Sequence, residues 1–164
     1  RVIGAAESQK ADLIIQITGD CPIIDPKIIE LTIRTFLANN VDYVSNIEVR
    51  SYPDGMDVQV FSLDNLKKSA SMTNDRLDRE HVSLHMRKNP DLFKHYNVIA
   101  PRKYMNPNLG LTLDEEKDYF LIKKIIECLY PNSPNFSCGE ILQFLAMNPK
   151  LVSINSEVKR KGNA

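Results

Sequence analysis

The sequence of 164 residues has no excess charge of either sign, because 21 lysines and arginines are balanced by 21 aspartates and glutamates. No overall field therefore attracts the chain to nucleic acid or to an anionic membrane surface. No apolar run reaches the roughly 20 residues of a membrane-spanning helix, and no charged-then-apolar leader opens the sequence. These absences predict a cytoplasmic protein that binds neither nucleic acid nor membrane.

Cysteine is scarce: only Cys21, Cys128 and Cys138 occur, and none of them forms a CxxC pair. An odd number at these spacings excludes a disulfide framework and a structural zinc site, and is typical of a reducing compartment. The hydrophobic share of 43% is enough for an ordinary core in a chain of this length. One domain is the expectation.

The apolar pattern alternates between strands and helices. Strands are expected at residues 12–18, 41–45, 56–61, 96–100 and 109–113. Helices are expected at residues 26–39, 63–72, 77–88, 115–130 and 141–147. The nearly continuous apolar run at 12–18 predicts a central strand buried on both faces, joined through the first of these helices to 41–45 by a parallel crossover. The alternation predicts an α/β fold with a Rossmann-like, mostly parallel sheet flanked by helices.

The two ends of the sequence predict different things. Residues 1–10 are typical of the middle of a helix without a cap, so the sheet is expected to lack its N-terminal strands. Residues 1–155 are expected to belong to one domain. The polar residues 156–164 are expected to form a flexible tail.

Two aspartates follow predicted strands. Asp20 comes after the run at 12–18, and Asp114 comes after 109–113. Ligands of open α/β sheets bind at the carboxyl ends of strands, and Mg²⁺ takes one or two carboxylates together with waters and phosphates. The pair is a candidate magnesium site, although a turn residue and a helix N-cap explain the same positions.

A succession of motifs resembles one enzyme family. In order along the chain these are ITGDCPIIDPKIIE, DYVSN, SYPDGMDVQVFS, DREHV, KNPDLF and LTLDEEKDYFLI. The succession resembles cytidylyltransferases of the spore-coat polysaccharide biosynthesis type, which are relatives of the acylneuraminate and 3-deoxy-manno-octulosonate enzymes. The resemblance covers residues 1 to about 155. It implies a fold like that of the nucleotide-diphospho-sugar transferases, with Asp20 and Asp114 as catalytic residues that hold Mg²⁺.

The resemblance also implies an activity and further site residues. The activity is transfer of CMP from CTP to an acidic sugar, with release of pyrophosphate, in surface polysaccharide biosynthesis. The substrate-binding residues that it implies are Arg50, Tyr52, Asp54, Gly55, Asp57, Arg79, Glu80 and His81. From the residues alone, 50–57 is equally an ordinary turn, whereas Arg79 to His81 favour a surface ion pair and a core histidine over a binding role.

The family's basic, glycine-containing loop, which grips the nucleotide phosphates, has no counterpart in the 164 residues. The chain is therefore expected to correspond to the C-terminal two thirds of the enzyme and to be inactive alone. Relatives commonly form homodimers, for which residues 62–86 are the candidate contact. Two alternatives are a truncated, non-catalytic assembly module and a glycosyltransferase that uses a nucleotide sugar. An Asp-x-Asp motif would favour the glycosyltransferase, but GDCP contains a single aspartate.

Overall fold

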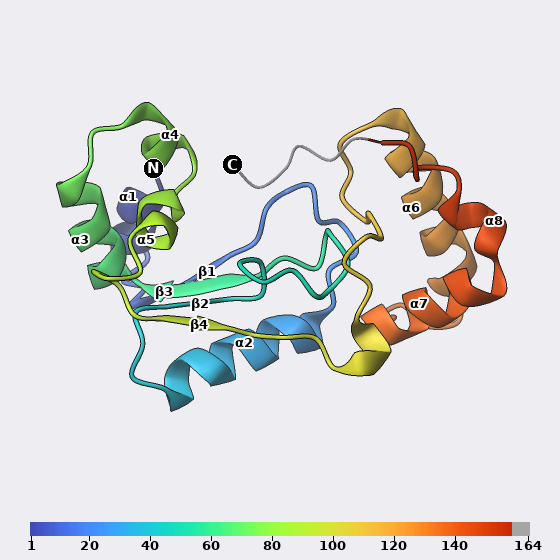
Figure 1. The fold of residues 1–164 in the computed structure, drawn as a ribbon, viewed down its shortest axis with the longest axis horizontal. Helices are drawn as coiled ribbons and strands as arrows, with labels where there is room; N and C mark the ends of the chain where they lie inside the picture. Colours follow the sequence, from blue (N-terminus) through green and yellow to red (C-terminus); the bar gives the residue numbers. More distant parts are fainter. Residues whose placement is uncertain (159–164) are drawn as a thin grey trace. The chain divides into compact units, whose positions relative to one another are not determined.

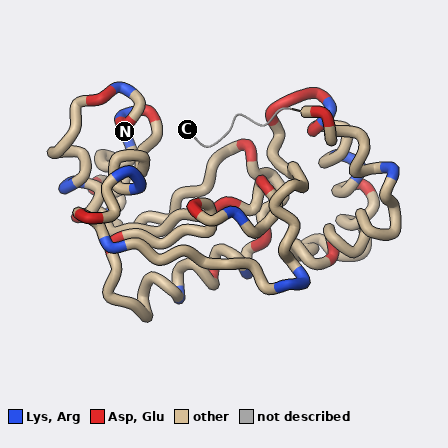
Figure 2. Tube along the Cα trace, viewed as in Figure 1, with Lys and Arg blue, Asp and Glu red and all other residues tan. Residues whose placement is uncertain are grey.

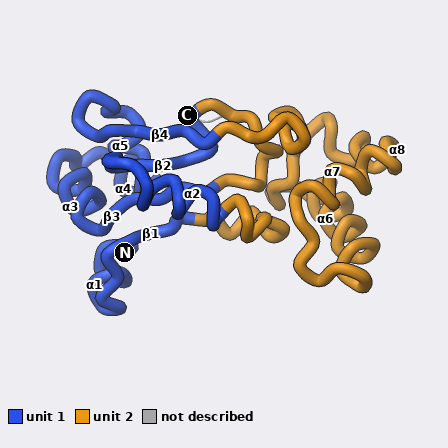
Figure 3. Tube along the Cα trace, turned by 90° about the horizontal axis from the view of Figure 1, so that it is seen from below, with its two compact units in different colours: residues 1–16, 29–48, 58–98 blue, residues 17–28, 49–57, 99–164 orange. Residues whose placement is uncertain are grey.

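The structure is a computed structural model in which residues 1–158 are described. These residues form two compact units, each assembled from separate stretches of the chain (Figure 3). Unit 1 comprises residues 1–16, 29–48 and 58–98, and unit 2 comprises residues 17–28, 49–57 and those from 99 onward. The expectation of a single domain over 1–155 stays a prediction.

Unit 1 contains a four-stranded sheet formed by β1 (Leu13–Gln16), β2 (Tyr43–Ser45), β3 (Gln59–Ser62) and β4 (His95–Asn97). The strand order is β1-β3-β2-β4. β3 runs antiparallel to both of its neighbours, whereas β2 and β4 are parallel. The α/β class and the flanking helices are confirmed, but the described sheet is mixed rather than mostly parallel.

The predicted central position of the first strand is wrong for the described sheet. β3 lies between β1 and β2, so β1 pairs on one side only among the described strands. The Ile15 side chain is 37% exposed, whereas Val60 of β3, directly opposite it, is fully buried. An apolar run indicates that a strand is buried, but it does not specify which other strand or helix covers it.

Helices cover both faces of this sheet (Figure 1). They are α1 (Val2–Ser8), α2 (Pro26–Ala38), α3 (Leu63–Met72), α4 (Arg76–Glu80) and α5 (Leu84–Lys88). The core beneath α1, α3 and α5 is a cluster of large side chains: Tyr43, Phe61, Leu66, Met86 and Phe93.

The helix predicted at 77–88 is in fact two short helices, α4 and α5. Between them the Ser83 side chain is buried and its hydroxyl donates to Gln59 Oε1, which also accepts from the Tyr43 hydroxyl. A buried serine that must reach an acceptor on a strand favours a break over a continuous helix.

Unit 2 is mostly helical. It contains the 3₁₀ helix η1 (Arg102–Tyr104) and the helices α6 (Glu116–Leu129), α7 (Cys138–Met147) and α8 (Pro149–Val152). Leu111, Leu121, Ile125 and Ile141 are fully buried in it. The strand predicted at 109–113 is absent, because Gly110 alone forms a bridge, to Asp54.

The tail predicted at 156–164 lies largely outside the described residues, which end at 158. Lysine and arginine are interspersed with aspartate and glutamate along both units (Figure 2). Within residues 1–158, no helix has the length and apolar character needed to cross a membrane.

One buried carboxylate connects two helix starts in unit 2. Asp25, 2% exposed, accepts the Lys27 N–H through Oδ1 at 2.8 Å and so caps α2, with Pro26 as the first helical residue. Its Oδ2 accepts the N–H of Cys138, the first residue of α7, at 2.8 Å. The second of these bonds spans 113 positions of the sequence, so local spacing could not have predicted it.

We expect Asp25→Ala to lower the free energy of unfolding by roughly 2–4 kcal/mol, because two helix N-termini lose a buried acceptor. Urea denaturation measures this effect. Asp75→Ala is the control, because Asp75 caps only the short, exposed helix α4. Equal losses for the two variants would contradict the double role of Asp25.

Candidate functional site

A backbone hydrogen bond brings the two predicted metal ligands together in unit 2. The Leu113 N–H donates to the Asp20 carbonyl oxygen at 2.8 Å, so Asp114 follows directly on a residue bonded to Asp20. Asp20 is half-buried and Asp114 is exposed. The backbones of Asp20 and Asp114 are thus close, but an irregular segment rather than a parallel strand carries Asp114, and the joint role of the two side chains stays a prediction.

The turn before α2 holds the Asp20 side chain. Cys21 Sγ donates to Asp20 Oδ1 at 3.7 Å, and Cys21 Sγ lies 3.3 Å from Thr18 Oγ1. Burial raises the pKa of the Cys21 thiol to about 11. The thiol therefore keeps its proton at neutral pH and can donate it to Asp20. Cys21 was assigned no role from the sequence.

Arg50 lies in an internal ion pair within the same unit. Its two terminal nitrogens donate to both carboxylate oxygens of Asp57, at 3.0 and 2.9 Å, and Nη1 lies 3.1 Å from Asp54 Oδ1. All three side chains are 21–22% exposed. A bidentate ion pair of this kind fixes the conformation of the turn at 50–57.

Carboxylates outnumber cations around this turn. Burial raises the pKa of Asp57 above its usual range, Arg50 opposes the rise, and the nearby Asp54 and Asp20 add to it. Burial alone would lower the pKa of Arg50, but the hydrogen bond to Asp57 and the negative charges of Asp57 and Asp54 together outweigh this and raise it. Two carboxylates share one guanidinium, and the charge of Asp20 also acts on Asp57, so the surroundings of Asp20 favour a cation over a further anion.

Gly55 allows the turn to lie against the backbone that leads to Asp114. Its φ is +105°, and a Cβ there would lie 2.6 Å from the carbonyl carbon and oxygen of Leu111. On either side of Gly110, the Asp54 N–H donates to Leu109 O at 2.9 Å and the Leu111 N–H donates to Asp54 O at 2.6 Å. The turn at 50–57 and the segment at 109–111 are thus joined by backbone hydrogen bonds.

Tyr52 and the residues Arg79, Glu80 and His81 were also predicted to bind substrate. Tyr52 is 2% exposed and packs in the core of unit 2, where burial raises the pKa of its hydroxyl. Arg79, Glu80 and His81 are exposed residues of unit 1, at the end of α4. Arg79 donates to the carbonyls of Ala70 and Thr73 at the end of α3. Their roles in substrate binding stay predictions.

Asp20 and Asp114 supply carboxylate oxygens, the kind of donor that Mg²⁺ prefers, and their role as its ligands stays a prediction. Within residues 1–158 no group of three or more His, Cys, Asp or Glu side chains has the arrangement of a metal site. A structural metal cage is therefore absent from this part of the chain. Two carboxylates with open positions for water and phosphate are the set that Mg²⁺ commonly takes in nucleotide enzymes.

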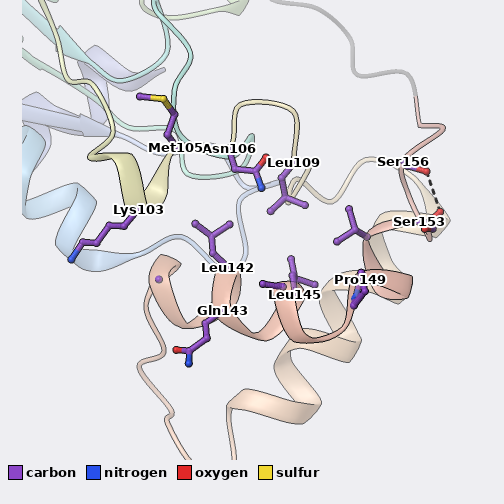
Figure 4. A pocket seen from close by; sticks show the side chains of 13 residues that line it. Lys103, Met105, Asn106, Leu109, Leu142, Gln143, Leu145, Pro149, Ser153 and Ser156 are labelled. Atoms are coloured by element: carbon purple, nitrogen blue, oxygen red, sulfur yellow. Dashed lines mark hydrogen bonds between the residues drawn. The ribbon is translucent and has the colours of Figure 1, made fainter.

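Unit 2 also contains an apolar groove of about 710 Å³ between the loop after η1 and helices α7 and α8 (Figure 4). Met105 and Leu109 from the loop and Leu142 and Leu145 from α7 line it. None of the predicted site residues does. The groove therefore lacks the carboxylates that a metal–nucleotide site requires.

Residues 1–142 match the sequence model of a family described as cytidylyltransferase. The chain belongs to the cytidylyltransferase family. The resemblance drawn from the motifs is thereby confirmed. The match ends within α7, so residues 143–158 contribute structure beyond it.

Three proteins similar to this cytidylyltransferase chain show how far the likeness extends. An uncharacterized protein of Methanocaldococcus jannaschii is 31% identical over 98% of the chain and 64% of its own length. The spore coat polysaccharide biosynthesis protein SpsF of Bacillus subtilis is 27% identical over 91% of the chain and 61% of its own length. The structure of a cytidylyltransferase from Leptospira borgpetersenii matches 92% of the chain and 63% of its own length, with a TM-score of 0.86 and 29% identity.

The chain thus spans 61–64% of the length of these relatives. Which part of each relative it matches, and whether the chain is active alone, stay predictions.

We expect Gly55→Ala in this cytidylyltransferase chain to lower the free energy of unfolding by roughly 2–4 kcal/mol, because backbone strain adds to the contact with Leu111. Gly19→Ala is the matched control, since Gly19 precedes Asp20 and no atom lies within 4 Å of its Cβ position. Thermal unfolding compares the two. Similar midpoints would contradict the close approach of the turn.

The cysteines should differ in reactivity. Burial raises the pKa of Cys21 to about 11 and that of Cys138 to about 12, whereas Cys128 is partly exposed. At pH 8 we expect a charged disulfide reagent to modify Cys128 first, because the thiolate is the reactive form. Cys21 should gain reactivity only as the pH approaches 11. Peptide mass mapping after timed quenching measures the order, and rapid modification of Cys21 at pH 8 would contradict it.

Proposed function

We propose that this protein transfers CMP from CTP to an acidic sugar and releases pyrophosphate, in the biosynthesis of a surface polysaccharide. Membership of the cytidylyltransferase family supports the transfer. The name of the Bacillus subtilis relative, a spore coat polysaccharide biosynthesis protein, supports the pathway class. The acidic sugar rests on the motif resemblance described above.

The observation that carries the proposal is the bond from Leu113 N–H to the Asp20 carbonyl. It brings the backbone of Asp20 close to that of Asp114, which lies 94 positions away in the sequence. Asp20 and Asp114 would hold Mg²⁺, which when bound offsets the negative charge of the CTP phosphates.

The remaining groups of the site would position these ligands. The Cys21 thiol orients Asp20, and Arg50 keeps the carboxylates of Asp54 and Asp57 in the turn. Because its charge is already engaged, Arg50 is a poor partner for the carboxylate of an acidic sugar. The cationic side chain that pairs with the sugar's carboxylate must therefore belong to another residue.

The chemistry proposed is a single in-line displacement. The anomeric hydroxyl oxygen of the sugar bonds to the α-phosphorus of CTP, and the bond from that phosphorus to the oxygen bridging to the β-phosphate breaks, so that pyrophosphate leaves with that oxygen. The hydroxyl proton passes to solvent water. The nearest thiol, Cys21, stays protonated at neutral pH because burial raises its pKa, so it is unsuited to covalent catalysis.

Two further proposals concern the setting of the reaction. A cytoplasmic location fits the use of CTP and the three free cysteines. A homodimer is proposed because enzymes of the family that the motifs resemble commonly form homodimers. A measurement of molecular mass in solution tests it.

The activity is tested in the intact protein by Asp20→Ala and Asp114→Ala. Each change should reduce Mg²⁺-dependent release of pyrophosphate from CTP by about 1,000-fold, because a bound metal contributes several kcal/mol to the transition state. Asp91→Ala, at an exposed aspartate of unit 1, should leave the rate unchanged.

The assay uses a panel of acidic sugars with each of the four nucleoside triphosphates. Near-normal rates in both site variants would reject the metal assignment. No pyrophosphate release with any sugar and any triphosphate would instead favour a non-catalytic assembly module.

A further inference from the structure

A fully buried carboxylate lies behind the first turn of α6. Asp118 is 0% exposed, and its Oδ2 accepts the N–H of Glu115 at 3.0 Å and the N–H of Asp114 at 3.3 Å. A buried carboxylate is stable only when its oxygens are hydrogen-bonded. Here it obtains part of that bonding from the backbone of the predicted metal ligand Asp114.

Asn155 completes the arrangement from the turn after α8. It is 4% exposed, and Nδ2 donates to Asp118 Oδ1 at 2.7 Å and to Gly110 O at 3.0 Å. An amide nitrogen has two hydrogens, so these two bonds use its full donor capacity. Asn155 thus connects Gly110, which forms the bridge to Asp54, with Asp118, whose carboxylate accepts the Asp114 N–H.

Asp114 is therefore restrained from both directions along the chain. Before it, Asn155 binds Gly110, and Leu113 binds the Asp20 backbone; after it, Asp118 binds Glu115. Asp114 is itself exposed, so packing around its side chain contributes little to fixing its place. Asn155 lies 13 positions beyond residue 142, where the family match ends (155 − 142 = 13).

We propose that Asp118 and Asn155 are positioning residues for Asp114, which set its backbone so that its carboxylate meets the cation held with Asp20. This inference rests on the proposed function, because it takes Asp114 to be a metal ligand. The physical basis is general: groups that fix a ligand from behind control metal affinity as the ligands do, commonly by 10- to 100-fold. The competing role is helix capping alone, which would change stability and leave metal affinity intact.

The experiment compares Asn155→Ala and Asp118→Asn with matched controls in the intact protein. Asn148→Ala removes an amide that donates to Phe144 O at the exposed end of α7. Glu140→Gln changes the carboxylate that accepts the Ser137 N–H at the start of α7, in the same capping position as Asp118. Asp114→Ala reports whether Asp114 binds metal at all.

Two measurements separate positioning from capping. Mn²⁺ alone is titrated into each variant and its dissociation constant is obtained from the electron paramagnetic resonance signal of the free ion. Amide hydrogen exchange at residues 114 and 115 reports directly on the bonds to Asp118. We expect both site variants to weaken Mn²⁺ binding by about 10-fold or more and to speed this exchange, with both controls unchanged in both readouts.

Each other outcome decides against the inference. If Asp114→Ala weakens Mn²⁺ binding but the folded Asn155→Ala and Asp118→Asn proteins stay within twofold of the parent, positioning is rejected and the proposed function stands. If Asp114→Ala binds Mn²⁺ as the parent does, the metal assignment and this inference fail together. If Asn155→Ala does not fold, the nearly isosteric Asp118→Asn decides. Failure of both to fold would show a requirement for folding rather than a positioning role.

Discussion

Three backbone hydrogen bonds hold the segment from Leu109 to Leu113, and the geometry of the candidate site depends on them. Leu109 and Leu111 bind the backbone of Asp54, and Leu113 binds that of Asp20. The segment is not a regular strand, so each of these bonds is an individual restraint and not one rung of a ladder. They unite the loop after β1, the turn at 50–57 and the start of α6.

Charge balance in this region follows from the same geometry. Asp54 and Asp57 share the guanidinium of Arg50, and the charge of Asp20 also acts on Asp57. Burial and mutual repulsion raise the pKa of Asp57, and the Cys21 thiol remains a donor because burial disfavours its thiolate. A local excess of negative charge in a chain with no net charge favours a bound cation at this site.

Local patterns predicted most elements with only small errors at their ends. α3 was predicted within its observed bounds, and α2 and α6 to within one or two residues. The errors arose where long-range contacts decide. The 109–113 segment has the composition of a strand but bonds to a turn and a loop, and 77–88 has helical spacing but breaks so that Ser83 can reach Gln59.

By itself, the sequence determined the α/β class, the family and the candidacy of Asp20 and Asp114, because each is encoded in local periodicity or in an ordered set of motifs. Tertiary structure alone decided the antiparallel placement of β3, the internal pairing of Arg50 and the burial of Asp118 against Asn155. The placement of β3 and the contact of Asp118 with Asn155 join residues far apart in the chain, whereas Arg50 pairs with carboxylates four and seven positions away. The spacing of residues specifies which side chains share a face of one helix or strand, but only the folded chain determines which distant donor meets a buried acceptor.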